Sequence, residues 1–150
     1  MNTRIPKIAL TIVLALAGSA ALAQATPAGL WRTIDDDGKT EKSQVRISES
    51  GGVFSGKVEK IANPARQDAR CDKCSDARKD QPLLGLVVIQ GVRANAGEAG
   101  LWDGGEILDP NNGKTYKVRM RLTGEGKALE LRAYLGMPLI GRTQTWQRIE

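Results

Sequence analysis

The stretch TYKVRMRLTGEGKALELRAYL, residues 115–135, alternates apolar and polar side chains on both sides of a glycine-rich turn. Every second residue from 116 to 122 is apolar, and the same period returns from Leu129 to Leu135. A period of two places successive side chains on opposite faces of a β-strand. The stretch therefore predicts an antiparallel hairpin with one face in the core and one in solvent.

The same alternation recurs in short runs beyond residue 28, separated by turn segments such as DDDGK, ESGG and DPNNGK. The expected strands cover residues 29–33, 42–48, 53–61, 82–93, 100–108, 115–123, 128–135 and 140–149. Only the connection over residues 62–81 is long. Eight strands joined in order by mostly short links predict an all-β fold, an eight-stranded antiparallel up-and-down barrel.

The N-terminus has the features of a signal peptide. Arg4 and Lys7 precede an apolar core over residues 8–17, and a small-x-small cleavage site ends at Ala23. We expect residues 1–23 to be removed as a signal peptide, leaving residues 24–150 as one domain in the periplasm or secreted. The apolar run is too short to favour a retained helix, so we expect no membrane span in the mature form.

The chain contains no histidine. This excludes Ser-His-Asp and Cys-His catalysis and any zinc site built on imidazole, while two cysteines alone do not complete a thiolate site. We therefore expect neither a metal nor a cofactor, and a protein that is not an enzyme.

The charge balance gives no sign of a nucleic-acid partner. Of the 22 basic residues, two lie in the expected signal peptide, so the mature form has 20 against 17 acidic residues, or +3. This excess is spread along the chain, whereas nucleic-acid binding favours a clustered basic patch.

The two cysteines, Cys71 and Cys74, lie in the long connection at a spacing found in both disulfide oxidoreductases and zinc half-sites. A catalytic pair normally begins a helix that follows a strand, and the residues around this pair predict only a loop. An exported protein meets oxidising conditions, in which a disulfide persists. We favour a disulfide that shapes the loop, and thiol–disulfide chemistry remains the less favoured alternative.

The run PLLGLVVIQGV, residues 82–92, is apolar on both faces of the expected strand 82–93. Such a strand should be covered on both sides. The cover is either the 62–81 loop, which leads directly into it, or a partner subunit in a homodimer through strand 82–93. We favour the loop.

The last expected strand, IGRTQTWQRIE, has no plainly apolar face. If the large side chain of Trp146 points inward, Arg142 and Gln144 accompany it. A buried arginine needs a partner. Two interpretations stay open: an arginine stacked on a tryptophan that plugs one barrel end, or an anion-binding group inside a cavity.

Several motifs carry a resemblance. GLW at residues 29–31 resembles the Gly-x-Trp signature of lipocalins, in which an arginine of the final strand packs across the tryptophan. Here Trp31 would be the barrel-closing tryptophan, with Arg142 or Arg148 as its partner, and Arg148 is preferred. GLWRTIDDDGK, NPA, CDKC, LWDGGEILDPNNGKTYK and GRTQTW together resemble the bacterial exported family known as domain-of-unknown-function family 2147. This resemblance covers about residues 28–149 and implies a lipocalin-like barrel of the cell envelope, with no established activity.

Two main classes of function remain. In the first, the barrel interior binds a small apolar or amphipathic molecule, because eight strands leave room for one small ligand or for side chains alone. In the second, the barrel is filled and the protein is an interaction or structural component of the envelope. The residues expected to bind a ligand are Tyr116, Met120, Leu131, Arg142, Gln144 and Trp146.

Overall fold

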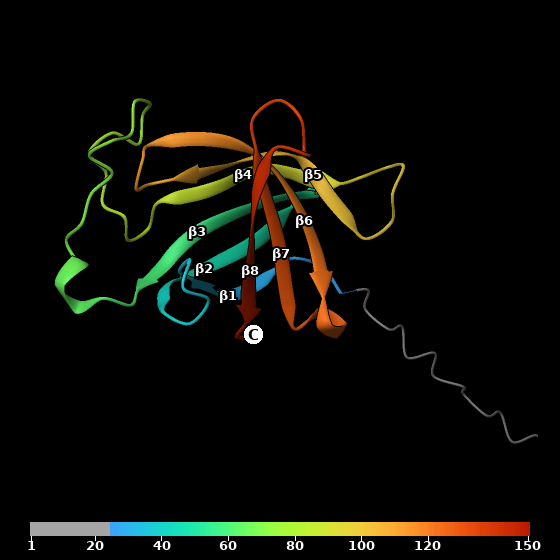
Figure 1. Cartoon of the computed structure of the whole chain (residues 1–150), viewed down its shortest axis with the longest axis horizontal. Coiled ribbons are helices and arrows are strands. Elements are labelled where there is room, and N and C mark those ends of the chain that lie inside the picture. The colour runs from blue at the N-terminus through green and yellow to red at the C-terminus, as the bar shows by residue number, and fades with distance from the viewer. Residues whose placement is uncertain (1–24) are drawn as a thin grey trace, which may run out of the picture.

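A computed structural model describes residues 25–150, so the expected signal peptide lies outside the described residues. Eight antiparallel strands form a closed barrel in which each strand pairs with the next along the chain and β8 pairs with β1 (Figure 1). The strands are β1 Gly29–Ile34, β2 Glu41–Ser50, β3 Val53–Ile61, β4 Val87–Ala94, β5 Leu101–Asp109, β6 Lys114–Thr123, β7 Ala128–Tyr134 and β8 Gly141–Arg148. Two short 3-10 helices, η1 Pro64–Arg66 and η2 Gly124–Gly126, lie in connections. This confirms the predicted barrel.

None of the helices in residues 25–150 has the length and apolar character needed to cross a membrane.

The β6–β7 hairpin has the predicted alternation of buried and outward-facing residues. Met120 pairs with Leu131, and both are buried in the core, as alternation requires. The prediction for Leu135 was wrong: β7 ends at Tyr134, and the side chain of Leu135 is 62% exposed. The chain leaves the sheet here because Gly136 adopts a φ of +72°, which favours glycine and begins the turn to β8.

Strand β4 begins five residues later than the predicted strand 82–93. Pro82 forms an isolated bridge with Arg70, and the amide of Leu83 donates to the carbonyl of Ala69 at 2.8 Å. The amide of Cys71 likewise donates to Gln81 at 2.9 Å. These bonds attach residues 81–83 to their own loop, so the long connection runs over residues 62–86.

The burial of β4 does not follow strict alternation. Register shifts between β3 and β4 leave Val88 and Ile89 both buried and Val87 39% exposed. Val88 lines the barrel interior, and Arg78 of the connection donates to the carbonyl of Val87 at 3.2 Å, so the connection contacts the start of this strand. A homodimer through this strand stays a prediction.

One end of the barrel is closed by Arg148 and Trp31. The guanidinium carbon of Arg148 lies 4.2 Å from the centroid of the Trp31 ring, and Trp31 is fully buried. The guanidinium also donates to three backbone carbonyls at 2.7–2.8 Å, those of Thr26, Ala28 and Gly126. Burial lowers the pKa of Arg148. These bonds join the two ends of the described chain to the η2 turn.

Candidate functional site

A cavity of about 860 Å³ opens at the other end of the barrel. Its mouth lies among the β1–β2, β5–β6 and β7–β8 connections and the start of the long connection at Asn63 and Arg66. Neither Trp31 nor Arg148 lines it. Arg148 is the last residue of β8 and Arg142 is its second, so the closed end and the open end are separated by the length of one strand.

The deep part of the cavity is apolar. Val45 of β2, Val58 of β3, Leu131 of β7 and Trp146 of β8 all line it and are all buried. Side chains alternate between the two faces of each strand, which turns these four toward the interior. Val45 and Val58 pair across β2 and β3 and so lie on the same face. Such a lining suits an apolar ligand segment.

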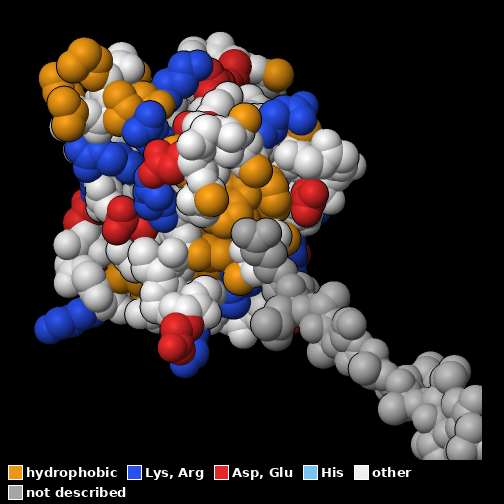
Figure 2. Space-filling view, turned by 90° about the vertical axis from the view of Figure 1, so that its right-hand side faces the viewer, with side chains coloured by type: hydrophobic (Ala, Val, Ile, Leu, Met, Phe, Trp, Pro, Cys, Tyr) orange, Lys and Arg blue, Asp and Glu red, His pale blue; other side chains and the backbone are white. Residues whose placement is uncertain are grey.

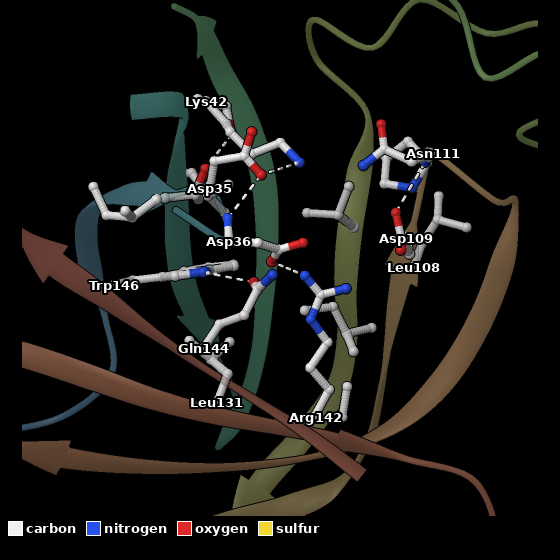
Figure 3. A pocket seen from close by; sticks show the side chains of 18 of the residues that line it. Asp35, Asp36, Lys42, Leu108, Asp109, Asn111, Leu131, Arg142, Gln144 and Trp146 are labelled. Carbon is white, nitrogen blue, oxygen red and sulfur yellow. Dashed lines mark hydrogen bonds and ion pairs between the residues drawn. The ribbon is translucent and has the colours of Figure 1, made fainter. Parts of the chain in front are cut away.

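Gln144 and Trp146 form a hydrogen-bonded pair in this lining. The indole Nε1 of Trp146 donates to Oε1 of Gln144 at 3.3 Å (Figure 3). This bond satisfies the buried indole donor, so the tryptophan presents its ring to the cavity. Gln144 is paired with Leu131 across β7 and β8, which places both at the same level of the barrel.

Part of the mouth is polar and carries side chains of both charges. Arg142 forms an ion pair with Asp36, and Lys42 Nζ lies 3.5 Å from Asp35 Oδ1 (Figure 3). The Arg142 side chain is 56% exposed, so its expected place in the buried interior was wrong. The reason is that Arg142 is the second residue of β8, directly after the β7–β8 turn.

The β1–β2 turn, which carries Asp36, is stabilised by the next residue, Asp37. Oδ1 of Asp37 accepts the amides of Lys39 and Thr40, each at 2.8 Å. The hydroxyl of Thr40 also donates to Asp37, and this bond is the largest cause of the lowered pKa of the Asp37 carboxyl. The β1–β2 connection is therefore organised by its own hydrogen bonds, and Asp36 is left free of that role.

The β5–β6 turn forms the opposite side of the mouth. Asp109 Oδ1 accepts the amide of Asn111 at 2.9 Å, and the Asp109 carbonyl accepts the amide of Gly113 at 2.8 Å. Asn112 Nδ2 donates to the hydroxyl of Tyr116 at 2.9 Å. Tyr116 thus lines the cavity and contacts the β5–β6 turn through its hydroxyl.

The structure brings together five of the six residues expected to bind a ligand: Tyr116, Leu131, Arg142, Gln144 and Trp146. Met120 does not line the cavity, because it is fully buried in the core, opposite Trp102. Sequence reasoning missed the role of Asp36, since the acidic run DDDGK also has the composition of a turn. It also missed Ile140, which lies at the mouth and is 75% exposed.

Cys71 and Cys74 lie at disulfide distance, with 1.94 Å between their sulfurs and 5.3 Å between their Cα atoms. Both are buried. Within residues 25–150, no helix begins at this pair, so it lacks the helix N-terminus that activates a catalytic thiol. The surroundings favour a local clip.

Two contacts attach the long connection, residues 62–86, to the barrel. Arg78 donates to the carbonyl of Val87 at 3.2 Å and to the hydroxyl of Thr115 at 3.1 Å. Gly113 packs so tightly against the loop that a Cβ there would overlap the carbonyl of Lys73. Hydrogen bonds from Arg78 lower the pKa of the Asp76 carboxyl to about 2.

Comparisons with known proteins agree with this architecture. The model of a family described as uncharacterized proteins conserved in bacteria, DUF2147, matches residues 29–148. Among solved structures, the chain is similar to protein HP1028 from the human pathogen Helicobacter pylori, which is described as belonging to the lipocalin family. The two share 21% identity over 82% of each chain, with a TM-score of 0.69. The search of curated proteins gave no match. At this identity the likeness shows the fold, a lipocalin-like barrel.

Proposed function

Because the chain belongs to DUF2147, a family of proteins conserved in bacteria, and has a lipocalin-like barrel, we propose that it is an exported binding protein for one small molecule. The ligand would be apolar or amphipathic and would occupy the barrel interior. The observation that carries the proposal is the cavity of about 860 Å³, which is closed at one end and open at the other. Small-molecule sites typically have volumes of about 300–1,000 Å³.

The same cavity favours ligand binding over a barrel filled by its own side chains. A filled barrel would leave the residues of β7 and β8 packed against those of β2 and β3. Instead, Leu131 and Trp146 line the same open volume as Val45 and Val58. An apolar chain in this volume would be removed from water, which is the main source of affinity for such ligands.

The rim supplies the chemistry for a polar head group. Arg142 holds Asp36, and both side chains are more than half exposed, so exchanging one carboxylate for another costs little. A carboxylate or phosphate of the ligand would replace Asp36 and form a charge-assisted, bidentate contact with the guanidinium. Lys42 lies on the same rim, where its ammonium is paired with Asp35 in the same exchangeable way. We therefore expect an anionic amphipathic ligand to bind better than a neutral one of the same chain length.

Export rests on the sequence of residues 1–23, with its basic start, apolar core and small-x-small site. Native mass spectrometry of the protein purified from its own periplasm or culture medium tests export and binding together. The expected mass is that of residues 24–150 with one small molecule bound. Recovery of the full-length chain from the cytoplasm would contradict export, and recovery of the exported chain without bound cargo from cells in every growth phase would contradict binding.

A further inference from the structure

The β7–β8 hairpin tip carries an unusual concentration of exposed apolar side chains. We define the tip as residues 135–140. Of the seven large hydrophobic residues exposed in the described part of the chain, it contributes four: Leu135, Met137, Leu139 and Ile140. Leu139, at 83%, is the most exposed of the seven. The tip projects from the barrel in Figure 1, and Figure 2 shows a protruding corner of hydrophobic side chains beside Lys and Arg side chains.

The tip is held in shape by the barrel. Arg132 of β7 reaches into the turn, where its Nε donates to the carbonyl of Pro138 and its Nη2 to that of Leu139 at 3.0 Å. Its Nη1 donates to the hydroxyl of Thr143 at 2.8 Å. An arginine with these bonds fixes the backbone of the turn while the apolar side chains stay in solvent. An exposed apolar patch organised in this way indicates a contact surface.

The flank of the tip is positively charged. Arg132 pairs with Arg119 across β7 and β6, so two arginines occupy neighbouring positions on these strands. Neither forms an ion pair with any carboxylate of residues 25–150. Arg119 Nε is also buried without a hydrogen-bond partner in this part of the chain. Two adjacent, uncompensated arginines favour an anionic surface.

We propose that the tip docks the protein onto an anionic phospholipid bilayer. Met137 and Leu139 enter the interface between head groups and acyl chains, while Arg119 and Arg132 face the lipid phosphates. A bilayer fits better than a second copy of the chain, because a stable protein interface buries about 800 Å² on each partner, far more than one short tip offers.

Docking also places the cavity against the bilayer. Leu135 and Ile140 belong both to the tip and to the lining of the mouth. A docked tip therefore gives an amphipathic molecule an apolar path between membrane and barrel. This last step rests on the proposed function, whereas docking itself does not. Met137 and Leu139 do not line the cavity, so membrane docking and ligand binding can be tested separately.

The test is flotation of the mature protein with vesicles of phosphatidylcholine alone and of phosphatidylcholine with phosphatidylglycerol. We expect binding to the anionic vesicles, and a fall of about tenfold or more in the partition coefficient for the double variant M137S/L139S. The matched control L84S/I149S changes two exposed apolar residues outside the tip and should bind as the unchanged protein does. Absence of binding to anionic vesicles, or equal binding by M137S/L139S, would overturn the proposal.

Two further measurements separate the alternatives. Light scattering after size exclusion would overturn bilayer docking if the unchanged protein were a dimer and M137S/L139S a monomer, because the tip would then bind a second copy. Titration of M137S/L139S with a fluorescent fatty acid in solution should match that of the unchanged protein. Equal titration together with lost flotation supports docking as a function distinct from the cavity, while loss of both would overturn the assignment of Met137 and Leu139 to the membrane alone.

Discussion

Arg148 lies across the indole of Trp31 and ties it to the chain ends that close the barrel. A lysine has no planar fork, so it can neither stack in the same way nor serve all three carbonyls. We expect Arg148→Lys to lower the free energy of unfolding by about 2 kcal/mol, since at least one buried carbonyl loses its charged donor. Urea unfolding measures this. Arg142→Lys, at the exposed end of the same strand, should change it by less than about 0.5 kcal/mol, and equal effects would contradict the account.

Gly113 tests how the loop is attached to the β5–β6 turn. Gly113 and Gly104 have φ values of +73° and +77°, so alanine strains the backbone at both. Only at Gly113 would the new Cβ also meet the loop, at the carbonyl of Lys73, whereas Gly104 has nothing near it. Gly113→Ala should therefore speed tryptic cleavage at Lys73 and Arg78 several-fold over Gly104→Ala. Equal cleavage rates would show that the loop does not depend on this contact.

The Cys71–Cys74 pair closes a ring too small to stabilise the whole barrel. Loop-closure entropy for so short a ring gives about 2 kcal/mol at most. The double variant C71A/C74A should keep its barrel circular-dichroism spectrum and cooperative unfolding, while proteolysis of residues 62–86 becomes faster. Loss of the folded barrel at room temperature would contradict a local role. Reduction of the unchanged protein with a phosphine should speed proteolysis of residues 62–86 in the same way, which checks the double variant independently.

The ion pair between Asp76 and Arg78 should make the loop sensitive to acid. The folded-state pKa of Asp76 is lowered from 3.8 to about 2, so its contribution is complete above pH 3.8 and is lost as pH falls through about 2. The Arg78 Nε–H resonance, whose donor lies 3.1 Å from Asp76 Oδ1, should shift over this window. Asp76→Asn should abolish the shift and the exposed Asp68→Asn should preserve it. A shift that persisted in Asp76→Asn would exclude this carboxyl as the cause.

The strands were predictable because alternation is a local property of the sequence. Met120 and Leu131 illustrate this, since their inward faces follow from period two alone. The start of β4 was not predictable, because Pro82 and Leu83 bond to residues of the loop that are near only in the fold. The prediction for Leu135 failed for a related reason. Its apolar character matched the core, but the turn at Gly136 takes it out of the sheet.

The candidate site was predictable on its apolar side and incomplete on its polar side. Leu131 and Trp146 followed from strand faces, and so did their meeting in the interior. The stacked-arginine interpretation of β8 is confirmed for Arg148, whereas anion binding by Arg142 stays a prediction. Arg148 stacks on a tryptophan at the closed end, and Arg142 lies at the open end with an acidic partner. The sequence alone could not assign them, because both share one face of the strand and only the pairing of β8 with β1 separates them.

The central claim, that the open end of the barrel admits an amphipathic ligand, is tested most directly by titrating delipidated, refolded protein with a fluorescent fatty acid. Ala133 lines the cavity, so Ala133→Trp should block binding, and Arg142→Gln should weaken it by about tenfold for an anionic head group. Lys57→Ala, an exposed change on β3 that does not touch the cavity, is the matched control. We expect saturable one-to-one binding that Ala133→Trp abolishes and Lys57→Ala preserves. Binding that is unchanged in Ala133→Trp, or the absence of saturable binding in the unchanged protein, would contradict the account.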